Sequence, residues 1–306
     1  MNILNLTDNV KSDIKFQISK FPDGQQSVTI TDCRDTFDIS AIAKHPVKIK
    51  SRLNSFRDLE IIICATQALR DIGVKEIHLF TPYFVGARSD RKFDQGSTNY
   101  LKNVICPIIN SQKFETVSVI DPHSDVLEAC LNNYVKEDNR RLVKFALPLI
   151  DNRNGAPERI CLVSPDAGAY KKIFDVAKKF GIDNVVTANK VRDMKTGKIL
   201  STEIPNLPGS TGDSNSANDG MKYVIVDDIC DGGRTFIELA KAIKKERISA
   251  KIYLVVTHGI FSAGLKELNQ HFEGIFTTNS YSDMNDPEFS LRNDNEMHKL
   301  KQLNVI

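Results

Sequence analysis

The feature that most restricts the fold of this chain is an alternation of short apolar runs with amphipathic segments. Residues 76–84 and 159–168 have the apolar, β-branched character of strands that run into a loop. Residues 60–73, 169–181 and 234–246 have apolar residues at helical spacing, and the first two of these segments end at a glycine. Strands that alternate with helices are typical of parallel sheets, because two parallel strands need a long crossover between them. The sequence therefore predicts an α/β fold.

The alternation runs through the chain twice, which predicts two similar domains, each a mostly parallel sheet flanked by helices. The expected boundary gives domains of 1–145 and 146–306, and 306 residues are enough for two domains of ordinary size. One segment departs from the pattern. Residues 201–220 are rich in Ser, Gly, Asn, Pro and Asp, and the stretch before them carries four cations. We expect a mobile lid or tether over 188–220.

Composition narrows the class of protein. Hydrophobic residues make up 41% of the chain and charged residues 26%, as in a globular protein in water. The net charge of +2 gives no field for nucleic acid or an anionic membrane surface, and we expect neither as a partner. The six cysteines are scattered without a CxxC pair, which favours reduced thiols, and the first residues lack the apolar core of a secretory signal. We expect a cytoplasmic protein.

Acidic residues and histidines gather where the expected strands end. Ligands of open parallel sheets bind beyond the carboxyl ends of the strands, so side chains at these positions are candidates for chemistry. The candidates at strand ends are Asp121, His123, Asp166, Asp227, Asp228, Asp231 and His258.

The stretch YVIVDDICDGGRTF, residues 223–236, is the most informative of these ends. Gly232 and Gly233 leave the backbone bare just before a helix that opens at Arg234. Backbone N–H groups at the start of a helix attract a phosphate group, because the helix N-terminus adds positive potential. Carboxylates beside a phosphate would repel it unless they bind ribose hydroxyls or a metal. The stretch therefore predicts a sugar-phosphate site.

Each of these motifs alone also fits a structural role. The pair of acids at 227–228 with the glycines could be a helix cap and a surface loop. His123 could be a hydrogen-bonded structural histidine, Asp166 a turn residue, and Lys190 and Arg192 solvated loop charges. Their occurrence together, at strand ends or in the one lid-like segment, favours a shared site.

Taken in order along the chain, the motifs resemble those of the ribose-phosphate pyrophosphokinases, also called phosphoribosyl pyrophosphate synthetases. The resemblance implies a type I phosphoribosyltransferase fold in both domains. It covers residues 20–262, and the chain is identified as a divergent member of the sort found in large bacteriophages. The matching segments are KFPDGQ (20–25), PYFVGARSDRK (82–92), VIDPHSD (119–125), VSPDAG (163–168), NKVR (189–192), YVIVDDICDGGRTF (223–236) and VTHGIFS (256–262).

The resemblance implies a reaction in which Mg-ATP donates its β,γ-pyrophosphoryl group to the C1 hydroxyl of ribose 5-phosphate and releases AMP. By the same resemblance His123 and Asp166 belong to the Mg²⁺ site. Lys190 and Arg192 are lid cations that stabilise the transferring group. The loop after residue 226 binds the acceptor: Asp227 and Asp228 hold the ribose hydroxyls, and the 5-phosphate is wrapped by Asp231, Gly232, Gly233, Arg234 and Thr235.

The ATP side is implied in the N-terminal domain. Phe21, Asp23 and Gln25 correspond to the residues that contact adenine, and Arg88 and Ser89 to those near the ATP phosphates. Because the family builds its ATP site between subunits, we expect a homo-oligomer, a dimer or a hexamer.

The chain also departs from the family pattern. Gln25 replaces a Glu, Ser89 a Gln and Gly86 a Tyr, and the acceptor loop reads Asp-Gly-Gly-Arg-Thr instead of Asp-Thr-x-Gly-Thr. An arginine can grip phosphate with two hydrogen bonds, so Arg234 also suits a diphosphate. Three other functions therefore stay open: the same chemistry on ADP-ribose in an NAD-rebuilding pathway, a silent homologue that binds nucleotide and regulates a partner, and a simple phosphoribosyltransferase.

Overall fold

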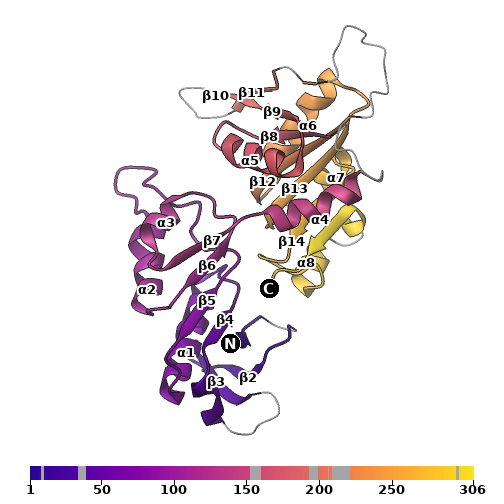
Figure 1. Ribbon diagram of the computed structural model, residues 1–306. Helices are drawn as coiled ribbons and strands as arrows, with labels where there is room; N and C mark the ends of the chain where they lie inside the picture. The colour runs from indigo at the N-terminus through magenta and orange to yellow at the C-terminus, as the bar shows by residue number, and fades with distance from the viewer. Residues whose placement is uncertain are drawn as a thin grey trace. The chain divides into compact units, whose positions relative to one another are not determined.

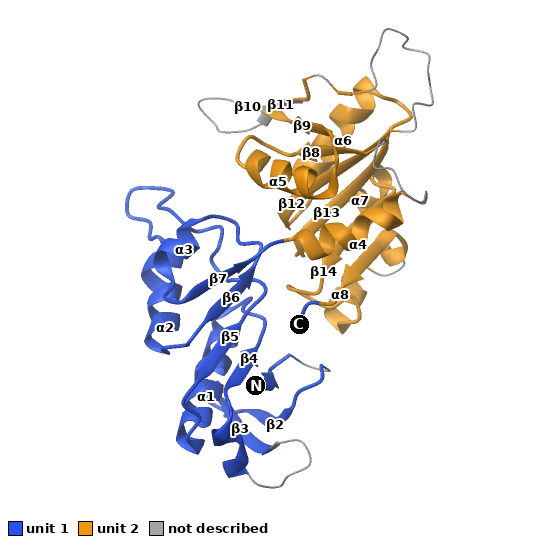
Figure 2. Ribbon diagram, viewed as in Figure 1, with its two compact units in different colours: residues 1–138, 305–306 blue, residues 139–304 orange. Residues whose placement is uncertain are grey.

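The protein is described by a computed structural model. The described residues are 1–7, 10–33, 39–151, 160–192, 199–205, 207–208, 221–293 and 296–306. The chain divides into two compact units, residues 1–138 with 305–306 and residues 139–304 (Figures 1 and 2). No helix of the described residues is both long enough and apolar enough to cross a membrane.

Unit 1 is built on a five-stranded sheet in which every pair of neighbours is parallel. The strands stand side by side in the order in which the chain makes them. They are β1 (Asn2–Asn5), β4 (Val47–Lys50), β5 (Ile77–Phe80), β6 (Val117–Ile120) and β7 (Tyr134–Glu137). An antiparallel hairpin of β2 (Ile14–Lys20) and β3 (Gln26–Cys33) forms a second, two-stranded sheet.

The longest helix of the unit, α1 (Phe56–Ile72), has clear local signals at both ends. Ser55 accepts a hydrogen bond from the Asp58 amide, and the Asp58 carboxylate accepts one from the Ser55 amide at 2.9 Å, which is a complete capping box. The helix ends at Gly73, whose φ of 104° is in the left-handed region that glycine adopts without a steric cost.

The segment around Pro107 is a helix of two kinds. The π-helical turn η2 (Leu101–Ile105) leads into α2 (Cys106–Ser111), with Pro107 in the first turn of α2. Proline has no N–H and its ring crowds the carbonyl one turn earlier, so the chain widens before it. Unit 1 also contains the 3-10 helix η1 (Ile39–Lys44) and the short helix α3 (Val126–Cys130).

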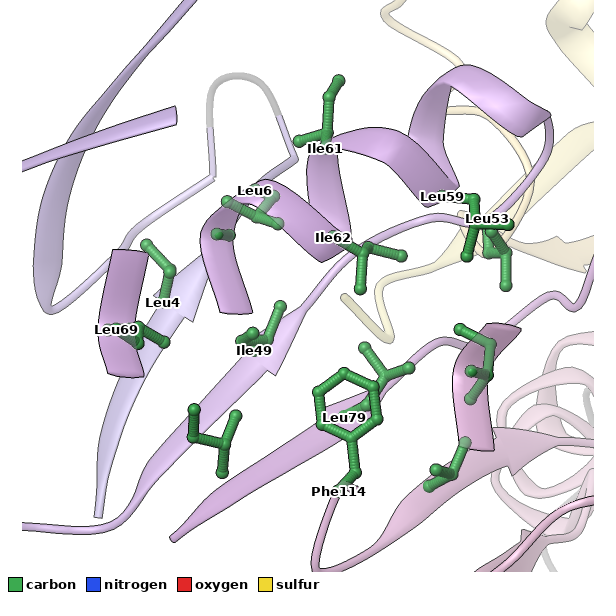
Figure 3. Packing of buried hydrophobic residues seen from close by; sticks show 14 of the residues in the cluster. Leu4, Leu6, Ile49, Leu53, Leu59, Ile61, Ile62, Leu69, Leu79 and Phe114 are labelled. Carbon is green, nitrogen blue, oxygen red and sulfur yellow. The ribbon is translucent and has the colours of Figure 1, made fainter. Parts of the chain in front are cut away.

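The core of unit 1 is one hydrophobic cluster between the sheet and its helices. Figure 3 shows Leu59, Ile62 and Leu69 of α1 above Ile49 and Leu79 of the sheet. These side chains are fully buried, so each contributes about 1.5–3 kcal/mol relative to an exposed position.

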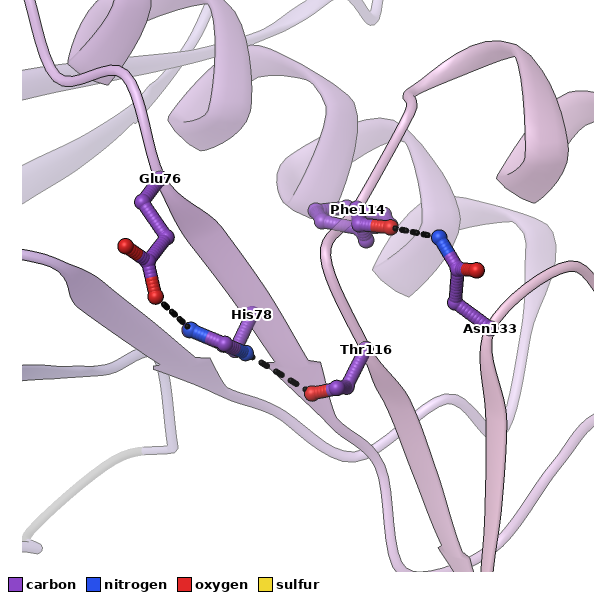
Figure 4. A network of polar contacts seen from close by, with 5 residues as sticks. All are labelled: Glu76, His78, Phe114, Thr116 and Asn133. Carbon is purple, nitrogen blue, oxygen red and sulfur yellow. Dashed lines mark hydrogen bonds and ion pairs between the residues drawn. The ribbon is translucent and has the colours of Figure 1, made fainter.

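Polar contacts hold the sheet of unit 1 at the amino ends of β5 and β6 (Figure 4). His78 contacts Thr116 Oγ1 at 2.8 Å through Nδ1 and Glu76 Oε1 at 2.9 Å through Nε2. Asn133 Nδ2 donates to the Phe114 carbonyl at 3.0 Å. This edge is therefore tied by side-chain hydrogen bonds, and the candidate residues of unit 1 follow the opposite, carboxyl ends of the strands.

Unit 2 is built on a six-stranded sheet that is also parallel throughout. Its spatial order is β15-β14-β13-β12-β8-β9. The strands are β8 (Ile160–Ser164), β9 (Asn184–Thr187), β12 (Lys222–Cys230), β13 (Lys251–Gly259), β14 (Gly274–Thr278) and β15 (Leu300–Leu303). The helices are α4 (Arg140–Ile150), α5 (Tyr170–Phe180), α6 (Arg234–Glu246), α7 (Lys266–His271), α8 (Pro287–Arg292) and the 3-10 turn η4 (Met297–Lys299).

Both faces of this sheet are covered. Successive residues of β12 belong to different hydrophobic clusters, Tyr223 and Ile225 to one and Val224 and Val226 to the other. The first cluster includes residues of α6, α7 and α8, and the second includes residues of α4 and α5. A strand buried on both faces reads as a continuous apolar run, which is why 223–226 lacks the alternation of a half-exposed strand.

The strand order of unit 2 contains a reversal. The chain makes β8, places β9 on one side of it, and then returns to place β12 on the other side. From β12 the later strands add outward through β13, β14 and β15. The loops after β8 and β12 therefore leave the sheet toward opposite faces, and in open parallel sheets such a reversal is where ligands bind. The described strands of unit 1 follow one another without such a reversal.

The predicted fold class, α/β with two mostly parallel sheets flanked by helices, is confirmed. The lid-like segment is described in part: β10 (Asn189–Arg192) and β11 (Ile199–Glu203) pair as an antiparallel ribbon. Residues 193–198 and 209–220 lie outside the described residues.

Candidate functional site

Two carboxylates lie near the end of β12, one of the two strands at which the strand order of unit 2 reverses. Asp228 is 6% exposed and Asp227 is partly buried. The Asp228 amide donates to Asp227 Oδ1 at 2.9 Å. Two acids near the buried end of a strand cost free energy unless they bind a ligand, because burial disfavours the charged form of a carboxyl group.

The electrostatics of Asp227 reflect that cost. Burial raises its pKa well above the ordinary value, and the charge of Asp228 raises the pKa further. The Asp166 carboxylate, which follows β8, acts on it in the same direction. Two acids that the sequence assigned to strand ends, Asp228 and Asp166, are therefore close enough to Asp227 to disfavour its charge. This concentration of negative charge favours a bound cation or the hydroxyls of a sugar.

Asp166 also has a structural role. Ser164 Oγ donates to the Asp166 carbonyl at 2.7 Å, and Asp166 Oδ1 accepts from the Ala169 amide at 3.2 Å, just before α5. The turn role that the sequence left open is thus present. It fixes the direction in which the carboxylate leaves the end of β8.

The loop after β12 opens α6 without a side-chain cap. Gly233 occupies the N-cap position with φ 81° and ψ −9°, and no side chain among the described residues caps the helix there. The first N–H groups of α6 are therefore available to an anion. Arg234 and Gly232 are exposed and Thr235 is half-buried. The arrangement suits a phosphate group bound by backbone amides, with a guanidinium beside it.

The two glycines of this loop are there for different reasons. A Cβ on Gly233 would lie 3.0 Å from Leu268 Cδ2, and its positive φ is unfavourable for any other residue. A Cβ on Gly232 would meet nothing closer than Ser262 Oγ at 3.8 Å. Gly233 is thus required by the fold, whereas a Cβ on Gly232 would make only ordinary van der Waals contacts.

The adenine-side candidates of unit 1 lie on the turn between β2 and β3. Phe21 is 50% exposed, and Asp23 and Gln25 are exposed. The turn is closed by hydrogen bonds from Phe21 N to the Gln25 carbonyl at 2.9 Å and from Gln25 N to Asp23 Oδ1 at 3.2 Å. Gln26, which is 2% exposed, donates its amide to Glu60 Oε1 of α1 at 3.0 Å. An exposed aromatic ring is therefore presented on an anchored turn.

The phosphate-side candidates Arg88 and Ser89 follow β5 in an irregular loop. Arg88 is exposed, and the Ser89 amide donates to the Gly86 carbonyl at 2.8 Å. Gly86 has φ 77°, and a Cβ there would lie 2.7 Å from Tyr100 Cδ1. The departure from the family's tyrosine at position 86 thus has a physical reason, because the ring of Tyr100 occupies the adjoining space.

The metal-site candidates belong to different units. His123 is exposed and follows β6 in unit 1, after a turn in which Asp121 has φ 42° and donates its amide to the Glu137 carbonyl at 2.7 Å. Asp166 belongs to unit 2. Among the described residues no three His, Cys, Asp or Glu side chains come together as a metal cage. Oxygen-rich, sparse donors suit Mg²⁺, which keeps several waters and is often held by substrate phosphates.

Three further positions complete the comparison with the sequence. Lys190 and Arg192 lie on β10, and their side chains are outside the described residues. His258 is 2% exposed and contacts Ser280 Oγ at 2.8 Å through Nδ1, which is a structural environment. Ser262 had no assigned role, and its Oγ lies 2.5 Å from Asp231 Oδ1. The motif VTHGIFS contained this serine, but nothing local to it pointed to Asp231.

Comparison with known proteins identifies the same region. The family model of the phosphoribosyl transferase domain matches residues 140–279, which contain every candidate of unit 2. A ribose-phosphate pyrophosphokinase of Vibrio parahaemolyticus is 25% identical over 269 residues, 87% of this chain and 78% of that protein. The enzyme of the same name from Sulfolobus acidocaldarius is 25% identical over 274 residues, 87% of this chain and 84% of that one. Similarity to ribose-phosphate pyrophosphokinases thus extends over most of the chain, and residues 140–279 match the phosphoribosyl transferase domain.

The similar proteins differ in how much of their length is matched. The pyrophosphokinase of Hyphomonas neptunium is 28% identical over 206 residues, which is 67% of this chain but 61% of that protein. A crystal structure of phosphoribosylpyrophosphate synthetase from Mycobacterium smegmatis has the same fold, with a TM-score of 0.73 at 16% identity. That likeness covers 95% of this chain and 86% of the other, so it extends over both units.

Proposed function

We propose that the protein transfers the β,γ-pyrophosphoryl group of Mg-ATP to the C1 hydroxyl of ribose 5-phosphate. The oxygen of that hydroxyl attacks the β-phosphorus, the bond to the α,β-bridging oxygen breaks, and AMP leaves as the hydroxyl proton is lost to solvent. The observation that carries the proposal is the buried end of β12, where Asp227 lies next to Asp228 and within reach of the charge of Asp166, followed by an uncapped helix start. Transfer of this kind depends on positioning and charge stabilisation more than on covalent catalysis.

The acceptor is assigned to unit 2. Asp227 and Asp228 would accept hydrogen bonds from the 2- and 3-hydroxyls of the ribose. These two donors would offset part of the free-energy cost of burying the carboxylate charges. The amides of Gly232 to Thr235 would hold the 5-phosphate, with Arg234 as a second source of positive charge. The raised pKa of Asp227 supports this assignment, since a strand end that only stabilised the fold would not concentrate acids.

The nucleotide is assigned to unit 1 and a second subunit. The exposed ring of Phe21, with Asp23 and Gln25 on the same anchored turn, would contact adenine, and Arg88 and Ser89 would meet the phosphates. An aromatic ring at half exposure on a fixed turn is a surface that stacking would cover. The proposal therefore includes a homo-oligomer, a dimer or a hexamer, in the cytoplasm.

His123 and Asp166 would hold Mg²⁺, whose chemistry when bound is to neutralise charge on the triphosphate. Lys190 and Arg192, on the β10 ribbon, would approach the pyrophosphoryl group and stabilise the charge that develops as it moves. Their value would be largest in the transition state, so their loss should reduce turnover more than ATP binding.

A second acceptor is favoured by one observation, the absent side chain at Gly232. The family pattern has a threonine there, and a Cβ on Gly232 would meet Ser262 Oγ and Ala263 Cβ at ordinary van der Waals distances of 3.8 and 3.9 Å. With Arg234 exposed in the same loop, the loop has positive charge for a diphosphate, as in ADP-ribose, which also ends in a ribose with a free C1 hydroxyl.

AMP release from Mg-ATP tests both acceptors. The purified protein is supplied with ribose 5-phosphate, with ADP-ribose or with no acceptor, and phosphorus NMR identifies the product. Formation of AMP with ribose 5-phosphate supports ribose 5-phosphate as the acceptor. Formation of AMP only with ADP-ribose supports ADP-ribose as the acceptor instead. AMP with neither, despite ATP binding, would make the chain a silent nucleotide-binding homologue. Asp228→Asn should raise the acceptor KM, and Asp175→Asn on the exposed face of α5 is the matched control.

A further inference from the structure

The loop after β13, residues 260–264, is hydrogen-bonded through its first three residues to the last residue of β12 and the residue after it. The amides of Ile260 and Phe261 donate to the Cys230 carbonyl at 2.9 and 3.2 Å. The Ser262 amide donates to the Asp231 carbonyl at 3.2 Å. The backbone that leads into the glycines of the acceptor loop is therefore set by its neighbour.

A side-chain contact completes this connection. Ser262 Oγ donates to Asp231 Oδ1 at 2.5 Å, a short distance of the kind found when the acceptor is a charged carboxylate. Ser262 is exposed and Asp231 is half-buried, so the contact lies at the rim of the site. One oxygen of the acid is thus engaged by the protein itself.

The loop after β13 is itself held in place by packing. Phe261 has φ 48°, unusual for a residue with a large side chain, and its ring is fully buried against Phe289 at a centroid distance of 6.3 Å. A Cβ on Gly259 would lie 2.2 Å from Phe261 Cε2, so only glycine permits this packing. Strain of this kind persists where the surroundings fix it, and it commonly occurs beside binding sites.

We propose that Ser262 is a positioning residue for the acceptor. Through Asp231 it holds the loop of Gly232 and Gly233 in the conformation that presents the first amides of α6 to the acceptor's phosphate. This inference rests on the proposed function for its substrate. In this proposal Asp231 holds the loop in its conformation, and the backbone amides contact the phosphate. A loop held in place before binding loses less entropy when the phosphate arrives.

Ser262→Ala removes the contact, and Ser262→Thr keeps the hydroxyl. We expect the alanine variant to raise the KM for ribose 5-phosphate about tenfold, as for loss of one hydrogen bond to a charged group, with the KM for ATP unchanged. The threonine variant should restore most of the affinity. Ser111→Ala is the matched control, because it removes an exposed serine hydroxyl that donates to the Ile108 carbonyl in unit 1.

Hydrogen exchange supplies a readout that needs no substrate. In Ser262→Ala the hydrogen-bonded amides of Phe236 and Ile237, which donate to the Gly233 carbonyl, and of residue 262, which donates to the Asp231 carbonyl, should exchange faster, while those of β12 and β13 keep their protection. Unchanged exchange in the loop would overturn the proposal, and so would faster exchange throughout the sheet, which would mean a general structural role. If the unaltered protein releases no AMP with ribose 5-phosphate, the proposed function fails, yet the exchange result still decides whether Ser262 holds the loop.

Discussion

Replacing the two neighbouring glycines of the acceptor loop by alanine should have opposite effects on stability. For Gly233→Ala, a left-handed conformation costs a residue with a side chain about 1–2 kcal/mol. Crowding of a buried leucine by the new methyl group adds about 1–3 kcal/mol, since three carbons of Leu268 lie 3.0–3.3 Å from the Cβ position. The smaller entropy of the unfolded alanine chain offsets about 0.4–1 kcal/mol of this. The net loss is roughly 1–5 kcal/mol.

Gly232→Ala is the matched control in the same loop. Its φ is outside the left-handed region and the nearest atoms to a Cβ are at 3.8 and 3.9 Å, so only the unfolded-state term applies. That variant should be unchanged or more stable by about 0.4–1 kcal/mol.

Urea unfolding followed by circular dichroism at 222 nm measures both variants, and the chain has no tryptophan to follow by fluorescence. Because the two units can unfold separately, the data are fitted for two transitions, and Gly233→Ala should move the one that belongs to unit 2. Equal midpoints for the two variants would refute the steric reasoning. A loss shared by Gly232→Ala would show that the loop is more crowded than the structure describes.

Three further perturbations act on separate parts of the molecule. Ser55→Ala breaks the capping box with Asp58 and should lower the stability of unit 1 alone by about 1 kcal/mol; urea unfolding would contradict this if both transitions moved. The raised pKa of Asp227 means that the folded state keeps a proton that the unfolded chain loses above pH 3.8. Stability therefore falls as the pH rises from 3.8 to the raised pKa of the folded state. Asp227→Asn should therefore be more stable than the unaltered protein at pH 7 and equal to it below pH 3.8, in urea titrations with EDTA. Lys190→Ala should lower turnover by about 10²–10³ with little change in the dissociation constant of ATP, and unchanged turnover would remove Lys190 from the mechanism.

Local sequence patterns predicted the elements whose signals are local. Residues 234–246 were expected as a helix and form α6 with those bounds, because a glycine precedes an amphipathic run that ends in lysines. The hairpin of β2 and β3 and the strands β14 and β15 were not predicted. Their residues are identified as strands mainly by the partners they meet, and pairing is not visible in a single segment.

The candidate site divides in the same way. Asp166, Asp227 and Asp228 could be grouped from the sequence, because the carboxyl ends of parallel strands share one edge of a sheet. His258 was grouped with them by the same rule, but its ring is buried and contacts Ser280 Oγ through Nδ1. Ser262 could not be assigned, since its contact with Asp231 joins residues 31 positions apart.

The strand order of the two sheets has a consequence for how the protein is made. Every strand of the first sheet has been synthesised by Glu137, and each pairs with a neighbour made shortly before it, so this sheet can assemble while the ribosome is still adding the second unit. The second sheet cannot, because β8 pairs early only with β9, and its pairing with β12 forms only after Lys222–Cys230 have left the ribosome. Closing that long loop is slow and entropically costly. The first unit is thus ready first, and the loop after β12 is among the last parts of the molecule to take shape.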